Sequence, residues 1–207
     1  MSDHSSVFIV DDDAAVRDSL TMLLEAAGYT VEAFQRAADF LDSLTPSAQG
    51  CLILDVHMPN MDGLELQEEL LRRGARLPVI FLSGHGTIPV TVRAVKAGAM
   101  DFLTKPVDGP ALLAHVQKAL EQDLARQKRI ESYQSAAARL ATLTDREWEV
   151  LKLAIAGHVS KEIGKCLGIS SRTVEIHRAH ILQKTGAANM LEVARITGML
   201  ESGQEPT

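Results

Sequence analysis

The chain has 207 residues, of which 46% are hydrophobic and 23% are charged, and its formal net charge is −6 at pH 7. This length suits two small domains, and the hydrophobic content supports a sizeable core. No apolar run approaches the roughly 20 residues that a membrane-spanning helix needs, and the N-terminus lacks the features of a secretion signal. The two cysteines do not suggest a disulfide framework. We therefore expect a cytoplasmic protein.

Charge is distributed unevenly along the chain. Residues 1–118 carry 9 Lys and Arg against 16 Asp and Glu, whereas residues 142–207 carry 8 against 8. The first part is therefore acidic and the last part neutral. Any affinity of the last part for nucleic acid must come from a local basic face and not from bulk charge.

The first 118 residues alternate strand and helix patterns. Apolar runs that predict strands occupy residues 7–10, 30–34, 51–54, 79–82 and 101–104, and helical spacing follows each run. One of these helices is expected around Val92, Val95 and Lys96, closing at Gly98. This alternation predicts an α/β fold, a doubly wound five-stranded parallel sheet with helices on both faces. The nearly continuous apolar runs 51–54 and 79–82 indicate central strands that are buried on both faces.

A long helical pattern runs from Gly109 to about Leu140. A helix of about 30 residues would span roughly 45 Å. It is either the last helix of the first domain followed by a solvated charged linker, or a helix that pairs with its twin in a dimer. Apolar spacing returns at Ile130 and Tyr133 after a polar break, which favours the second interpretation.

Residues 142–200 show helical patterns and no strand pattern. Thr144 and Glu147 form a capping box that predicts the start of one helix, and Ser160 is expected to cap a short helix that ends at Leu167. A glycine-containing turn at 168–170 leads to a helix over 171–185, and another helix follows Gly186. A short helix, a turn and a second helix indicate an all-α four-helix helix-turn-helix domain. We therefore divide the chain into residues 1–120, a helical linker over 121–141, and residues 142–207.

Polar side chains follow four of the expected strands. They are the run Asp11-Asp12-Asp13, Asp55, Ser83 and Lys105. In an open parallel sheet, ligand sites form outside the carboxyl ends of the strands, so we expect these side chains to meet at one edge.

Mg²⁺ prefers oxygen ligands. The set suits a Mg²⁺-assisted phosphoryl transfer onto Asp55, in which Lys105 neutralises phosphoryl oxygens and Ser83 hydrogen-bonds one of them. Each residue alone could be a cap, a turn residue or a surface charge, but their joint placement favours the functional interpretation.

Several motifs in residues 5–120 resemble the receiver domain of two-component systems. They are Val10-Asp11-Asp12, the stretch from Leu54 to Gly63, Ser83-Gly84-His85-Gly86, Lys96-Ala97-Gly98-Ala99 and Phe102-Leu103-Thr104-Lys105-Pro106. The resemblance implies that Asp55 is the phosphoacceptor and that Asp11, Asp12, Asp55 and the main-chain carbonyl of His57 bind Mg²⁺ or Mn²⁺. It also implies that Ser83 and Lys105 are the family's hydroxyl and lysine. Phe102 occupies the family's aromatic switch position, although a plain core role remains open, and Asp13 is expected to cap the following helix.

The last domain resembles the helix-turn-helix of LuxR and FixJ/NarL regulators. The resemblance rests on the segments 143–151, 161–163, 169–170 and 172–178, the last of which reads Arg-Thr-Val-Glu-Ile-His-Arg. Two departures stand out. Gly164 replaces a usual alanine, at a cost of about 1 kcal/mol in a helix interior, and Thr185 replaces an apolar residue.

A recognition helix presents its N-terminal part to base edges and its flanks to phosphates. We expect Val174, Ile181 and Leu182 to pack inward. Glu175, Ile176 and Ala179 are then available to the major groove, where a glutamate can accept from a cytosine amino group. Phosphate contacts are expected from Lys161, Arg172, Thr173, His177, Arg178 and Lys184. A solvated charged face is the alternative for this helix taken alone.

These features together predict a phosphorylation-dependent DNA-binding transcriptional regulator that is not an enzyme. The resemblance implies a sensor histidine kinase, double-stranded promoter DNA and RNA polymerase as partners. We expect a switch through Ser83 and Phe102 that releases the last domain, promotes a homodimer on phosphorylation, or both. The resemblance favours activation of transcription over repression. One rival is an aspartyl-phosphate hydrolase, although such enzymes carry a carboxylate where this chain has His57. The other is a DNA-binding protein whose first domain is never phosphorylated and only dimerises. A nucleotide site is disfavoured because no Gly-rich loop follows the first strand.

Overall fold

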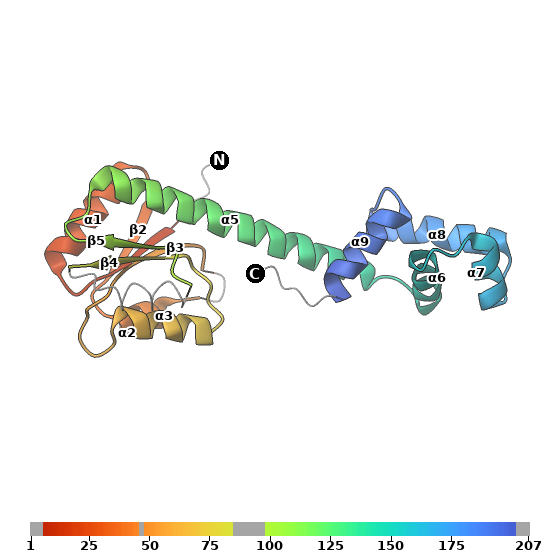
Figure 1. Ribbon diagram of the computed structural model, residues 1–207, viewed down its shortest axis with the longest axis horizontal. Helices are drawn as coiled ribbons and strands as arrows, with labels where there is room; N and C mark the ends of the chain where they lie inside the picture. The colour runs from red at the N-terminus through yellow and green to blue at the C-terminus, as the bar shows by residue number, and fades with distance from the viewer. Residues whose placement is uncertain (1–5, 46–47, 85–97, 202–207) are drawn as a thin grey trace. The chain divides into compact units, whose positions relative to one another are not determined.

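The computed structural model describes residues 6–45, 48–84 and 98–201 (Figure 1). The chain forms two compact units, Met1–Ala125 and Arg126–Thr207, which we call the N-terminal unit and the C-terminal unit. The boundary between them falls within the helix α5 (Gly109–Leu140). The helix expected around Val92 and Val95 lies outside the described residues.

The N-terminal unit is built on a parallel five-stranded sheet with the order β2-β1-β3-β4-β5. The strands are β1 (Ser6–Val10), β2 (Thr30–Phe34), β3 (Gly50–Asp55), β4 (Val79–Ser83) and β5 (Asp101–Thr104). Every residue of β3 and β4 is buried, as the continuous apolar runs predict. This order is that of the flavodoxin-like doubly wound fold, so the predicted fold class is confirmed.

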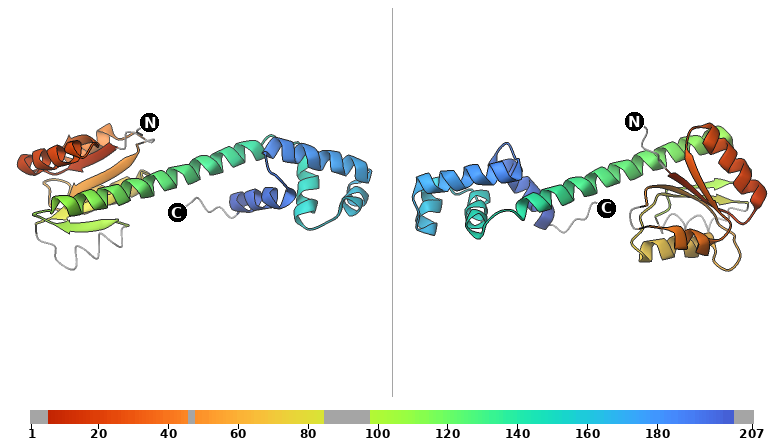
Figure 2. Two further views of the ribbon diagram at one scale, coloured as in Figure 1. Left: turned by 90° about the horizontal axis from the view of Figure 1, so that it is seen from above. Right: turned by 180° about the vertical axis from the view of Figure 1, so that it is seen from behind.

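Helices cover both faces of this sheet (Figure 1). The helices α1 (Ala14–Ala26) and α5 pack on one face, and α2 (Ala37–Ser43) and α3 (Gly63–Arg72) pack on the other. The right-hand view of Figure 2 shows the same two layers from behind. Asp13 accepts a hydrogen bond from the Ala15 amide at 2.8 Å, which confirms it as the N-cap of α1.

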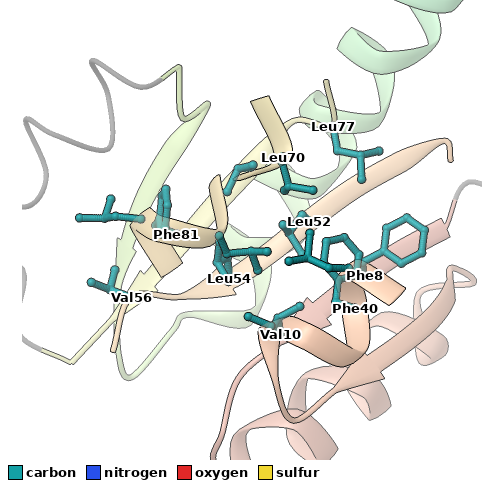
Figure 3. Close-up of a cluster of buried hydrophobic side chains, with 14 residues drawn as sticks. Phe8, Val10, Phe40, Leu52, Leu54, Val56, Leu70, Leu77 and Phe81 are labelled. Carbon is teal, nitrogen blue, oxygen red and sulfur yellow. The ribbon is translucent and has the colours of Figure 1, made fainter. Parts of the chain in front are cut away.

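The two faces of the sheet form two separate hydrophobic cores. Along β1, Val7 and Ile9 enter the core under α1 and α5, whereas Phe8 and Val10 enter the core under α2 and α3. Successive side chains of a strand point to opposite faces, so one strand supplies both cores. Figure 3 shows the second core, where Phe40 of α2 lies among Phe8 and side chains of β3.

The C-terminal unit contains α6 (Asp145–Ile155), α7 (Ser160–Leu167), α8 (Ser171–Thr185) and α9 (Met190–Glu201) after the end of α5. The predicted capping box of α6 is confirmed, because the Glu147 amide donates to Thr144 Oγ1 and the Thr144 amide donates to Glu147 Oε2 at 2.8 Å. The predicted cap of α7 is wrong by one residue. Val159 is the N-cap, and its amide donates to Glu162 Oε2 at 3.1 Å, which leaves the Ser160 hydroxyl for another partner.

Both departures from the family pattern have a structural reason. A Cβ on Gly164 would lie 2.7 Å from the Ile169 carbonyl oxygen in the turn between α7 and α8, so the glycine permits this close approach. The buried Thr185 hydroxyl donates to the Ile181 carbonyl at 2.7 Å. Its polar group is therefore satisfied within α8.

Both cysteines are free. Cys51 lies in β3, where burial raises the pKa of its thiol to about 12, and Cys166 is exposed. Among the described residues, no helix combines the length and the apolar character needed to cross a membrane.

Candidate functional site

Three carboxylates gather at the carboxyl edge of the sheet. Asp11 and Asp12 follow β1, and Asp55 ends β3. Val10 pairs with Leu54 in the parallel register of these neighbouring strands, so the residues that follow each strand are brought together. The ligand oxygens of the three carboxylates lie within 4.8 Å of one another. The spacing of strand ends in the sequence predicts this cluster.

Lys105 extends from the end of β5 into the carboxylate cluster. Its Nζ donates to Asp11 Oδ2 at 2.6 Å and lies 3.0 Å from Asp55 Oδ1. The Lys105 amide donates to the carbonyl of Ser83 at 2.8 Å, which ties the residue after β5 to the fully buried Ser83 at the end of β4. The peptide bond between Lys105 and Pro106 is cis. The structure therefore brings Asp11, Asp12, Asp55 and Lys105 together and places Ser83 on the adjoining strand end.

The electrostatics of the cluster favour a bound cation. Burial raises the pKa of Asp55, Lys105 opposes this rise, and the charges of Asp11 and Asp12 add to it. Burial acts to lower the pKa of Lys105, but its contacts with Asp11 and Asp55 outweigh burial and hold that pKa above its ordinary value. Three carboxylates around one ammonium leave excess negative charge. Their oxygens are the ligand type that Mg²⁺ prefers, so these residues fit a divalent cation.

Two neighbours support the cluster without entering it. Arg17 on α1 donates from Nη1 to the main-chain carbonyl of Asp11 at 2.7 Å, and so steadies the loop that carries Asp11 and Asp12. Gly63 begins α3, where an added Cβ would lie 2.2 Å from the Asp55 carbonyl oxygen. We did not predict either residue as part of the site. The contact of Arg17 is to main chain and leaves no sequence signal, whereas Gly63 does lie within the receiver motif.

The remaining predicted residues of this site are His57 and Phe102. His57 lies two positions after Asp55 and is exposed. The Phe102 ring lies 6.2 Å from the Phe81 ring, centroid to centroid, and packs partly buried against the core under α2 and α3. This placement is compatible with both the core role and the switch role of Phe102.

The surface of α8 carries most of the predicted DNA contacts. Val174 and Ile181 are buried and Leu182 packs against the same core, as expected for the inward face. The predicted DNA-contact residues differ in exposure. The exposed ones are Arg172, Glu175, Ile176 and Ala179 on α8 and Lys161 on α7. The partly buried ones are Thr173, His177, Arg178 and Lys184. Ser170 caps α8 by accepting from the Thr173 amide at 3.0 Å. The Nδ1 atom of His177 is buried and has no hydrogen-bond partner among the described residues.

Lys184, one of the predicted DNA contacts, is paired with a buried carboxylate. Its Nζ donates to Glu147 Oε2 at 2.6 Å and to the Thr142 carbonyl at 3.2 Å. Glu147 is almost fully buried. Burial acts to raise the pKa of Glu147, but hydrogen bonds from Lys184 and Thr144 outweigh burial and hold the pKa below its ordinary value. A DNA phosphate would have to compete with this carboxylate for Lys184.

Comparisons with known proteins match both units. Residues 7–117 match the response regulator receiver domain family, and residues 141–197 match the luxR family of bacterial regulatory proteins. The transcriptional regulatory protein FixJ of Azorhizobium caulinodans is 42% identical over 196 residues, which cover 95% of this chain and 93% of that protein. The transcriptional regulatory protein TdiR of Thauera aromatica is 47% identical over 182 residues, which cover 88% of this chain and 80% of that protein. The solved structure of the response regulator StyR aligns with a TM-score of 0.86 at 40% identity, covering 94% of this chain and 98% of StyR.

Proposed function

The chain belongs to the two-component response regulators with a LuxR-type DNA-binding domain, and from this premise we propose that phosphorylation of Asp55 controls its binding to promoter DNA. The observation that carries the proposal is the meeting of Lys105 with the three carboxylates around Asp55. Phosphoryl transfer asks a protein mainly for positioning and charge neutralisation, and this arrangement supplies both.

In the proposed reaction, a carboxylate oxygen of Asp55 attacks the phosphorus of a phosphohistidine on a sensor histidine kinase. The bond from phosphorus to the histidine nitrogen breaks, and the histidine leaves. Asp11, Asp12, Asp55 and the main-chain carbonyl of His57 would hold Mg²⁺ or Mn²⁺, which when bound neutralises charge on the transferring phosphoryl group. Lys105, now paired with Asp11 and Asp55, turns to the new phosphoryl oxygens, and the Ser83 hydroxyl donates to one of them.

The proposed output is a change of assembly. Movement of Ser83 and Phe102 reshapes the surface at β5, so that two copies dimerise and bind two half-sites about one helical turn apart. The DNA-bound dimer then contacts RNA polymerase and activates transcription. Because these steps need a kinase and chromosomal DNA in one compartment, we place the protein in the cytoplasm.

We also propose that the protein is not an enzyme acting on free substrates. Aspartyl-phosphate hydrolases carry a carboxylate for acid–base work two residues after the nucleophile, whereas this chain has His57 at that position. Turnover of phosphate esters by the purified chain would contradict this proposal.

Sedimentation velocity with Mg²⁺, with and without a small phosphodonor, tests the switch on the wild type and on Asp55→Asn. We expect a shift from monomer to dimer only in the phosphodonor-treated wild type, accompanied by tighter binding to DNA. A dimer in every sample would contradict phosphorylation-driven dimerisation and would point to α5 as a constitutive dimeriser. DNA affinity that is insensitive to both phosphodonor and Asp55→Asn would overturn the regulatory role of Asp55.

A further inference from the structure

One hydroxyl group joins an acidic and a basic side chain on the surface of α8. Ser160, the first residue of α7, donates from Oγ to Glu175 Oε1. The same Oγ accepts from Nη1 of Arg178 at 3.3 Å. Glu175 and Arg178 lie three residues apart on α8 and therefore on one side of that helix. Ser160 thus contacts two of the predicted DNA-contact residues from a different helix.

The hydroxyl is available because another residue caps α7. Glu162 accepts from the Val159 amide, so the Ser160 side chain is not needed at the helix N-terminus. A serine hydroxyl has one donor hydrogen and two acceptor lone pairs. It can therefore donate to a carboxylate and accept from a guanidinium at the same time, as it does here.

The residues that flank this contact in the sequence are exposed. Val159 and Ile176 are 59% and 49% exposed, and Glu175, next to Ile176 in the sequence, is also exposed. Val174, the residue before Glu175, is fully buried in the core of the C-terminal unit, so it fixes the backbone of α8 at this point. The side chains of Glu175 and Arg178 each have several rotatable bonds, and the hydrogen bonds of Ser160 restrain both of them.

We propose that Ser160 is a specificity-determining positioning residue that holds Glu175 toward base edges and Arg178 toward the phosphate backbone. This inference rests on the proposed function, because it requires α8 to enter the major groove. A glutamate in the groove is repelled by phosphates, and ordering its side chain has an entropic cost on binding. A carboxylate already held by a hydroxyl has less freedom to lose, and its second oxygen remains free to accept from a cytosine amino group.

A purely structural role for Ser160 predicts a different outcome. A hydrogen bond that only joins α7 to α8 would, when lost, lower the stability of the C-terminal unit and weaken binding to every sequence alike. A positioning role changes the preference at the base pair that Glu175 reads, and changes other positions little. Sequence preference therefore separates the two roles.

The experiment uses the full chain treated with a phosphodonor and a library of duplex oligonucleotides with a randomised central segment. Bound duplexes are sequenced for the wild type, Ser160→Ala, Ser160→Thr, Glu175→Ala and the double variant Ser160→Ala with Glu175→Ala. Ser132→Ala is the matched control, because Ser132 is an exposed serine on α5. Thermal unfolding of each variant is recorded in parallel.

We expect Ser160→Ala to bind DNA but to distinguish the preferred base pair from the others about fivefold to tenfold less well, at the same position that Glu175→Ala affects. This size is the lower end of the range for one good base contact. Ser160→Thr keeps the hydroxyl and should keep the preference, and Ser132→Ala should match the wild type. The double variant should discriminate no worse than Glu175→Ala at that base pair, because the two residues act through one contact.

An unchanged preference in Ser160→Ala, or an equal loss of affinity for all sequences, would overturn the proposal. If Ser160→Ala does not fold, Ser160→Val is compared with Ser160→Thr, because the two differ chiefly in the hydroxyl. Equal preferences in that pair would also overturn it. A phosphodonor-treated wild type that binds no duplex would instead overturn the proposed function itself, and the wild-type sample alone reveals that failure.

Discussion

The carboxylate of Asp123 accepts a hydrogen bond from the amide of Gly50 at 2.9 Å, across 73 residues of sequence. Asp123 lies on α5 and its residue is only 2% exposed, whereas Gly50 begins β3 with a φ of +132°. A Cβ on Gly50 would lie 1.9 Å from the carbonyl oxygen of Ser6 on β1. The contact therefore attaches α5 to the sheet edge opposite the carboxylate cluster, at a place where only glycine fits.

Replacing Asp123 by Ala is expected to destabilise the N-terminal unit by about 1–3 kcal/mol, because the buried Gly50 amide loses its acceptor. Asp123→Asn keeps an acceptor oxygen and should cost less. Urea unfolding and hydrogen exchange at the Gly50 amide measure the two effects. Gln122→Ala, at an exposed position on the same helix, is the control and should change neither. Exchange at Gly50 that stays as slow in Asp123→Ala as in the wild type would show that the contact is unimportant.

Replacing Gly63 by Ala is expected to affect both stability and phosphorylation. The new Cβ would press on the Asp55 carbonyl from 2.2 Å, and overpacking of this kind costs about 1–3 kcal/mol. The displaced Asp55 should also accept a phosphoryl group from a small phosphodonor more slowly. Gly198→Ala in α9 meets open space and should stabilise the helix by up to about 1 kcal/mol. Unchanged stability and phosphorylation in Gly63→Ala would contradict the role of this close approach.

Removing the charge of Asp55 is expected to raise the melting temperature when no divalent cation is present. The pKa of Asp55 is raised above its ordinary value of 3.8, so at neutral pH the ionised group is less favourable in the folded chain than in the unfolded chain. Stability linked to this group is present below pH 3.8 and is lost as the pH rises through the folded-state pKa.

Asp55→Asn removes the charge that burial and the neighbouring charges of Asp11 and Asp12 disfavour. Mg²⁺ should raise the melting temperature of the wild type more than that of Asp55→Asn, because the variant has lost a ligand. Thermal unfolding with and without Mg²⁺ measures both effects, and Asp18→Asn on the exposed side of α1 is the control. A lower melting temperature for cation-free Asp55→Asn, or equal responses to Mg²⁺, would be inconsistent with this description of the cluster.

The C-terminal unit should lose stability in acid through Glu147. The pKa of Glu147 is lowered below its ordinary value of 4.5, so its contribution is fully present above that pH and is lost as the pH falls through the folded-state pKa. The difference in unfolding free energy between the wild type and Glu147→Gln should therefore shrink with acid below about pH 4.5.

Fluorescence of Trp148 follows this unfolding, because it is the chain's single tryptophan and it packs against the core of the C-terminal unit. Glu149→Gln, which changes an exposed carboxylate on the same helix, is measured as the control. A Glu147→Gln difference that is constant with pH would refute the linkage.

Patterns that depend on local spacing were predicted well from the sequence. The strand Asp101–Thr104 and the helix Gly109–Leu140 have the expected bounds. The spacing of apolar residues predicts these elements, and nearby glycine and proline residues predict where they begin and end. The cluster of Asp11, Asp12 and Asp55 was also predictable, since parallel strands bring their carboxyl ends to one edge.

Contacts that join distant side chains were not predictable in this way. Asp123 lies in a charged stretch that resembles a solvated linker, yet its carboxylate is buried against Gly50. Lys184 has the position of a phosphate contact, but it donates to the buried Glu147. Ser160 was expected to cap α7, and its hydroxyl instead reaches α8. Each outcome depends on which partner lies nearby in three dimensions, and sequence spacing carries no information about that.

The alternation of β1 between the two cores limits how this chain can change length. Val7 and Ile9 face one core and Phe8 and Val10 face the other, and the acidic loop begins at the next residue. Inserting or deleting a single residue within β1 would turn side chains of this strand toward the wrong core and shift Asp11 away from Asp55 in the same event. Length variation in this part of the chain should therefore be confined to the loops, where it leaves the two cores and the acidic site in place.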